Sequence, residues 1–168
     1  MTDLSRYTDV HTHDTSRALD GDAIVSVEAG TTLLPGGTYS VGIHPWSTDR
    51  PVTLGRLRAL VAAARDPRVV AIGECGFDRL RGGSPEVQRR LFDFHARLAE
   101  QTGKPLIIHN VRATDELIAA RRRHRPTVEW VIHGFRGHPQ LAAQLLRAGF
   151  SLSTRQPLPG IPSYPETD

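Results

Sequence analysis

Short apolar runs alternate with longer segments in which apolar residues recur every three or four positions. The short runs predict seven β-strands, at residues 7–11, 23–28, 39–43, 69–72, 105–108, 128–132 and 150–153. The longer segments predict amphipathic helices at residues 53–65, 84–103, 114–123 and 139–148. Ser84 and Pro85 provide an N-cap and a first-turn proline for the longest helix, and Gly103 ends it.

This order of elements predicts parallel strands joined by helical crossovers. Strands that alternate with helices are typical of α/β proteins, and seven such strands favour a TIM-type (β/α) barrel, with an open doubly wound sheet as the alternative. In a barrel, all residues that directly follow the strands lie on one face. Polar residues far apart in the sequence can therefore meet at one mouth.

The amino-acid composition is that of an ordinary globular protein. The 168 residues are 39% hydrophobic and 23% charged, which is enough for one domain with a sizeable core. The chain has neither a long apolar segment nor a basic-then-apolar N-terminus, and its single cysteine, Cys75, suits a reducing compartment, so we expect a cytoplasmic protein without a membrane segment. The net charge of +3 is compatible with phosphate-bearing partners but does not identify one.

Histidines and one glutamate recur at the predicted strand ends. His11 and His13 are two positions apart, so both side chains leave the strand on the same side. The later strands end in the same way, with the residues His44, Glu74, His109 and His133. A single histidine in such a place is most often a hydrogen-bonded structural imidazole. Five histidines and a glutamate in the same placement favour a metal site instead.

These residues resemble the TatD family of metal-dependent hydrolases, within the amidohydrolase-type barrels. The resemblance covers residues 7 to about 153 and rests on five segments in family order: Asp9-Val-His-Thr-His13, Val41-Gly-Ile-His-Pro45, Ala71-Ile-Gly-Glu-Cys-Gly-Phe-Asp78, Lys104-Pro-Leu-Ile-Ile-His-Asn110 and Ile132-His-Gly-Phe-Arg-Gly137.

The resemblance implies a set of roles around two divalent metal ions. His11 and His13 would bind one ion, Glu74 would bridge both, and His109 and His133 would complete the second site. His44, Arg112 and Arg136 would hold the substrate phosphate, although Arg112 lies one position later than is usual in the family. The ligand types leave Zn²⁺, Mn²⁺, Co²⁺ and Mg²⁺ all open.

The C-terminal segment departs from the family pattern. The family has an eighth strand that ends in Glu-Thr-Asp, whose aspartate binds metal and acts as a base, and this chain ends with Glu166-Thr167-Asp168. The prolines that precede this motif argue against a central strand. We therefore expect a barrel domain at residues 1–155, an irregular proline-rich tail at 156–168 from a truncated reading frame, and an eighth strand that is missing or irregular. Asp168 is then a less secure metal ligand and catalytic residue than Glu74.

The resemblance implies a phosphodiesterase that acts on DNA by means of a metal-activated water. Two alternatives remain: an amidohydrolase for a small cyclic amide or ester, and an inactive remnant that still binds metal. We expect no obligate protein partner. If the barrel is open between strands one and seven, the unpaired edges predict self-association and reduced stability.

Overall fold

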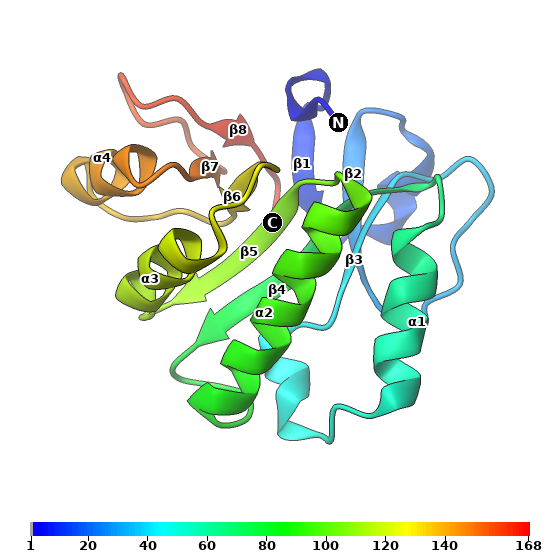
Figure 1. Ribbon diagram of the computed structural model, residues 1–168. Helices are drawn as coiled ribbons and strands as arrows, with labels where there is room; N and C mark the ends of the chain where they lie inside the picture. The colour runs from blue at the N-terminus through cyan, green and yellow to red at the C-terminus, as the bar shows by residue number, and fades with distance from the viewer. Residues whose placement is uncertain (1) are drawn as a thin grey trace.

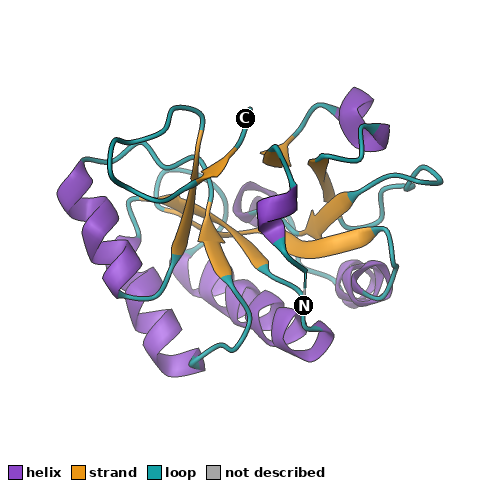
Figure 2. Ribbon diagram, turned by 90° about the horizontal axis from the view of Figure 1, so that it is seen from above, coloured by secondary structure: helices purple, strands orange, loops and turns teal. Residues whose placement is uncertain are grey.

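The chain forms a nearly closed barrel of eight parallel strands with helices on its outside (Figures 1 and 2). The computed structural model describes residues 2–168. The strands follow one another around the sheet in chain order: β1 (Asp9–Thr12), β2 (Ala23–Glu28), β3 (Tyr39–Gly42), β4 (Val69–Asp78), β5 (Leu106–Val111), β6 (Trp130–Ile132), β7 (Ser151–Thr154) and β8 (Tyr164–Pro165). The predicted barrel is therefore confirmed, and the open doubly wound sheet is excluded.

Residues 2–168 contain four α-helices and three short 3-10 helices, of which all but the first 3-10 helix join consecutive strands. The α-helices are α1 (Leu54–Ala64), α2 (Pro85–Thr102), α3 (Thr114–His124) and α4 (Pro139–Arg147). The 3-10 helices are η1 (Leu4–Arg6), η2 (Thr15–Leu19) and η3 (Pro45–Asp49). The Ser84 side chain accepts a hydrogen bond from the Val87 amide at the start of α2, and Gly103 adopts φ +65° at its end, as the sequence predicts. Across residues 2–168, no helix is both long and apolar enough to span a bilayer.

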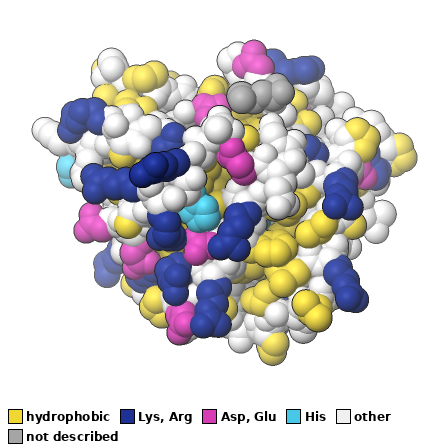
Figure 3. Space-filling model, viewed as in Figure 1, with side chains coloured by type: hydrophobic (Ala, Val, Ile, Leu, Met, Phe, Trp, Pro, Cys, Tyr) yellow, Lys and Arg dark blue, Asp and Glu magenta, His cyan; other side chains and the backbone are white. Residues whose placement is uncertain are grey.

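The main hydrophobic core lies between the sheet and the helices that cover it. Trp130 of β6 and Phe77 of β4 both pack against Phe92 of α2, with ring centroids 5.3 and 4.9 Å apart, respectively. All three side chains are almost completely buried. On the outer surface, hydrophobic side chains gather in the groove between α1 and α2, beside exposed arginines (Figure 3). The packing of the three aromatic side chains fixes β4 and β6, and the polar residues lie at or just beyond the ends of such strands.

Strand β4 is longer than the sequence predicts. It continues past Ile72 to Asp78, because Cys75–Asp78 pair in register with residues 108–111 of β5. Gly76 makes this close pairing feasible, since a Cβ atom there would lie 2.0 Å from the carbonyl oxygen of His109. Glu74 therefore projects from within a strand rather than from the loop after it.

The C-terminal tail also needs a correction, because it contains a short eighth strand. Tyr164 and Pro165 pair in parallel with Ser153 and Thr154 of β7. A proline is tolerated there because the strand is only two residues long and lies at the margin of the sheet. The seam with β1 is joined by side chains: the Thr167 amide donates to Oδ1 of Asp9 over 3.2 Å, and the Thr167 hydroxyl donates to Oδ2. The tail is thus held across the gap between the first and last strands.

Candidate metal centre

The structure brings the six predicted strand-end residues together at one mouth of the barrel. His11 and Glu74 project from β1 and β4, and His109 projects from β5. His13, His44 and His133 lie just beyond the ends of β1, β3 and β6. Parallel strands bring their carboxyl ends to the same face, which is why residues more than 120 positions apart meet here. His11 is fully buried, and Glu74 is only 4% exposed.

The two carboxylate oxygens of Glu74 face different groups of histidines. Oε2 lies 3.2 Å from Nε2 of His13 and 3.4 Å from Nε2 of His11. Oε1 lies 2.7 Å from both Nδ1 of His109 and Nε2 of His133. One buried carboxylate therefore stands between two pairs of imidazole nitrogens.

His44 is also beside Glu74, but its hydrogen bonds indicate a different role. Its Nδ1 accepts a hydrogen bond from the Trp46 amide over 3.1 Å, so the neutral ring carries its proton on Nε2. Nε2 lies 2.9 Å from Oε1 of Glu74 and is therefore placed to donate to it. A protonated nitrogen has no lone pair for a metal, which separates His44 from the ligand pairs.

Asp78 fixes the orientation of His109. Its Oδ2 lies 3.0 Å from Nε2 of His109 and 2.6 Å from Nε1 of Trp46, which donates to it. A proton on Nε2 of His109 leaves the lone pair on Nδ1 directed at Glu74. A carboxylate behind a histidine in this way is the usual support of a metal-ligating imidazole.

The donor set fits a divalent cation. Among residues 2–168, neither ring nitrogen of His11 has a hydrogen-bond partner, although the ring is completely buried. A buried nitrogen without a partner costs free energy unless a bound group, such as a metal ion, interacts with it. The separations of 2.7–3.4 Å between these histidine nitrogens and the Glu74 oxygens are also those of ligands sharing an ion at about 2.1 Å.

The carboxylates and imidazoles at the site stabilise each other's charged forms. Burial raises the pKa of Glu74, but the neighbouring His133, His109, His11 and His13 outweigh it and hold this pKa well below its usual range. Burial lowers the pKa of His11, yet the Asp168 and Glu74 carboxylates raise it to about 9. Glu74 is therefore ionised at neutral pH, and a metal at His11 has to displace a proton.

Asp168 reaches the same centre. Its Oδ2 lies 3.5 Å from Nε2 of His11 and 3.4 Å from Nε2 of His13, and the nearby His11 lowers the pKa of the Asp168 carboxyl group. The side chain is 36% exposed, so solvent reaches this carboxylate, whereas Glu74 is enclosed. The residue that seemed least secure from the sequence thus lies beside the His11 and His13 pair.

The two arginines predicted to bind phosphate are less closely associated with Glu74 and the histidines than Asp168 is. Arg112 is exposed, adopts φ +54° and makes no hydrogen bond or ion pair within residues 2–168. Arg136 is exposed and lines a separate cavity next to the loop after β6. Within residues 2–168, no hydrogen bond or ion pair joins either arginine to Glu74 or to the histidines. Arg81, in contrast, lies over the Trp46 ring at 4.4 Å from its centroid, close to His44.

Two carboxylates at the site were missed in the sequence. Asp78 had a signal, because it lies four positions after Glu74 and a strand sends such residues to the same side. Glu166 had none, because a proline-rich tail does not reveal its register. Its buried Oε2 accepts a hydrogen bond from Ser153 over 2.7 Å and lies 3.8 Å from Nδ1 of His133.

Comparisons with known proteins agree with this geometry. The family model described as "TatD related DNase" matches residues 8–159. An uncharacterized metal-dependent hydrolase TatD from Mycobacterium tuberculosis is 38% identical over 122 residues, which is 68% of this chain and 45% of that protein. A 3'-5' ssDNA/RNA exonuclease TatD from Erwinia billingiae is 36% identical over 129 residues, which is 72% of this chain and 47% of that protein. The chain thus spans less than half the length of these relatives.

A solved structure shares the fold. The crystal structure of YjjV, a TatD homologue from Escherichia coli, superposes with a TM-score of 0.69 at 26% identity and covers 90% of this chain and 68% of that one. The matched residues 8–159 include the five histidines and Glu74, and they make up most of the chain. By these matches the chain belongs to the TatD related DNase family of metal-dependent hydrolases.

Proposed function

We propose that this chain is a metal-dependent phosphodiesterase that hydrolyses single-stranded nucleic acid with two divalent ions. The observation that carries the proposal is the division of the Glu74 carboxylate between two pairs of histidines. In this arrangement His11 and His13, with Asp168, would hold one ion, His109 and His133 would hold the second, and Glu74 would bridge them. The names of the relatives support the substrate class, since one of them is an exonuclease for single-stranded DNA and RNA.

The protein's own residues would divide the remaining work. Ions bound there supply positive charge that activates a water molecule and neutralises the phosphate. Asp168, whose pKa is lowered and whose side chain is open to solvent, would accept the proton of the attacking water. His44, whose Nε2 proton is directed at Oε1 of Glu74, would instead donate a hydrogen bond to a phosphate oxygen bound beside that carboxylate.

The test is hydrolysis of a single-stranded oligonucleotide with added Mn²⁺, Mg²⁺ or Zn²⁺. We expect turnover that EDTA abolishes and that falls at least a thousandfold in Glu74→Gln, which keeps the size of the side chain but removes its charge. The matched control is Glu86→Gln, at an exposed position in the first turn of α2. Metal analysis of the wild type should give about two ions per chain.

Other substrates separate this proposal from its alternatives. Cleavage of small cyclic amides or esters, with no cleavage of phosphodiesters, would favour the amidohydrolase. Stoichiometric metal binding without turnover of either substrate class would favour the inactive remnant. Either result would contradict the proposed function.

A further inference from the structure

A second cavity lies beside the metal centre, between the loop after β6 and the segment after β7. Its volume is about 500 Å³, within the range of small-molecule sites. Arg136 and Arg155 line it from opposite segments, and Glu166 of the tail lines it as well. The resemblance implies that Arg136 holds a substrate phosphate, but the mechanism proposed above gives no role to Arg155, to Glu166 or to the cavity itself.

The two arginines are available for an anion. Both are exposed, and within residues 2–168 neither forms an ion pair or a side-chain hydrogen bond. Most of the carboxylates near the mouth are already engaged by histidines or by other arginines, as Asp9 is by Arg17. Two free guanidinium groups on one cavity are suited to binding a phosphate, because each presents several N–H donors in a planar fork.

On the inner side of the cavity lies a hydrogen-bond acceptor, Oε1 of Glu166, to which no group donates within residues 2–168. The Glu166 side chain is fully buried, and in the described part of the chain its Oε1 has no hydrogen-bond partner. Its Oε2 is directed at Ser153, whereas Oε1 is near Gly134, where an added Cβ would lie 3.8 Å from it. Gly134 also lines the cavity. A buried carboxylate oxygen left unpaired costs free energy, which a donor group on a ligand would recover.

We propose that this cavity is a nucleotide subsite, in which Arg136 and Arg155 bind a phosphate and Oε1 of Glu166 accepts a hydrogen bond from a hydroxyl or amino group of the same nucleotide. The choice of a nucleotide rests on the proposed nuclease function, whereas the cavity and its donors and acceptor rest on the geometry alone. Because Glu166 is close to His133, a nucleotide held here would place its neighbour in the strand near Glu74.

The test measures binding rather than turnover. Deoxyguanosine 5'-monophosphate and inorganic phosphate are titrated into the protein by calorimetry with EDTA present, so that no ion contributes. We expect Arg136→Ala and Arg155→Ala each to weaken nucleotide binding about tenfold or more. Glu166→Gln should weaken nucleotide binding about tenfold but change phosphate binding less than twofold, because only the nucleotide has a hydroxyl or amino group, separate from its phosphate, that can reach Oε1 while the arginines hold the phosphate.

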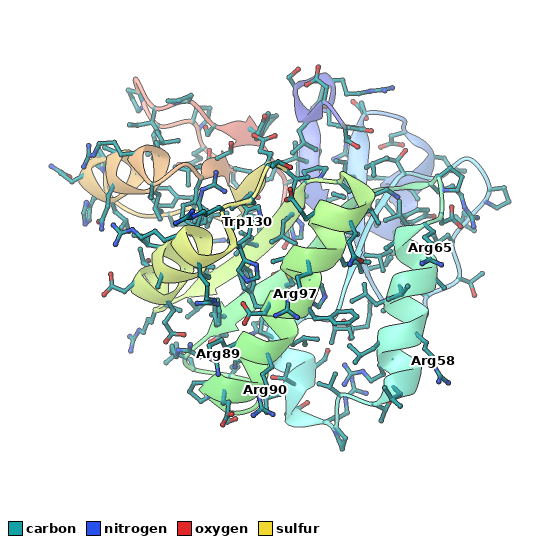
Figure 4. The ribbon with its side chains drawn as sticks, in the orientation of Figure 1. Arg58, Arg65, Arg89, Arg90, Arg97 and Trp130 are labelled. Atoms are coloured by element: carbon teal, nitrogen blue, oxygen red, sulfur yellow. The ribbon has the colours of Figure 1, made fainter. Side chains whose placement is uncertain are left out.

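Arg97→Ala is the matched control, because Arg97 is exposed on the outer face of α2, away from the barrel mouth (Figure 4). It should bind both probes like the wild type. Circular dichroism shows whether each variant is folded. If Glu166→Gln does not fold, Arg155→Ala, at an exposed position, still tests the proposal.

Three outcomes would overturn the subsite: no nucleotide binding, equal weakening by Arg97→Ala, or Arg136→Ala and Arg155→Ala within twofold of the wild type. Oligonucleotide hydrolysis combined with any of these would leave the proposed function intact. Nucleotide binding with the expected variant effects, but without hydrolysis, would support the subsite and contradict the proposed function.

Discussion

Nε2 of His109 lies 3.0 Å from Oδ2 of Asp78, and this pair connects the candidate metal centre to the surrounding protein. Asp78 also accepts hydrogen bonds from the Leu80 and Arg81 amides through Oδ1 and from Trp46 through Oδ2. Its carboxylate is 3% exposed. The loop after β4 and the orientation of His109 are therefore fixed by one buried side chain.

Asp78→Asn should impair the centre without unfolding the protein. The amide oxygen can still accept from the backbone, but an amide nitrogen opposite His109 reverses the hydrogen bond and favours the wrong tautomer. We expect a 10–100-fold loss of metal affinity or activity, the usual effect of losing such a partner. Metal titration and kinetics would measure it, with the exposed Asp49→Asn as the control. Unchanged affinity would show that Asp78 does not orient His109.

Metal should stabilise the protein in a pH-dependent way. His11 has its pKa raised to about 9 in the folded protein, against about 6.5 when unfolded. In metal-free protein, the stability from protonated His11 is thus complete below pH 6.5 and is lost as the pH rises through 9. Metal replaces that proton, so the melting temperature with metal should not fall over this interval.

Thermal melting with Zn²⁺ or Mn²⁺, and with EDTA, measures this difference. At a free metal concentration 100 times the dissociation constant, stabilisation is about 2.7 kcal/mol, which raises the melting temperature by roughly 5–10 °C. The double variant His11→Ala, His13→Ala should lose most of this increase. Equal melting temperatures with metal and with EDTA at pH 8 would contradict the assignment.

The seam between β8 and β1 should depend on Thr167. Thr167→Val removes the hydroxyl that donates to Asp9 and keeps the shape of the side chain. We expect a loss of about 1 kcal/mol of stability, weaker metal binding through the neighbouring Asp168, and more self-association through the open strand edges. Denaturant unfolding and size-exclusion chromatography test this. Thr31→Val is the control, since its hydroxyl bonds only within an exposed turn.

His95 should make the protein sensitive to mild acid. It is fully buried in α2, where its Nε2 accepts from the Ile43 amide over 2.9 Å, and burial lowers its pKa to about 4. Between pH 6.5 and 4 the unfolded chain binds a proton at this residue and the folded chain does not, so stability falls as the pH falls, by roughly 3 kcal/mol in all.

The comparison with His95→Gln isolates that contribution. Unfolding free energies of both proteins in EDTA, measured from pH 7 to 4, should show a less stable variant with a shallower dependence on pH. Parallel curves for the two proteins would mean that His95 does not account for the acid sensitivity.

The sequence by itself determined the barrel and the grouping of most residues of the candidate metal centre. Alternating strands and helices require parallel strands, and parallel strands place their carboxyl ends on one face, so His11, His44 and Glu74 could be grouped without coordinates. The helix ends followed from local chemistry, as with Ser84 and Gly103. These features depend on short-range patterns or on a topological rule.

Only the tertiary structure decided the contacts that depend on register. The extension of β4 to Asp78 comes from pairing with β5, and the position of Asp168 comes from the bonds of Thr167 to Asp9, 158 positions earlier in the chain. The protonated nitrogen of His44 likewise follows from the direction of the Trp46 amide. Such contacts are set by angstrom-scale distances between distant segments, and neither periodicity nor residue type encodes those distances.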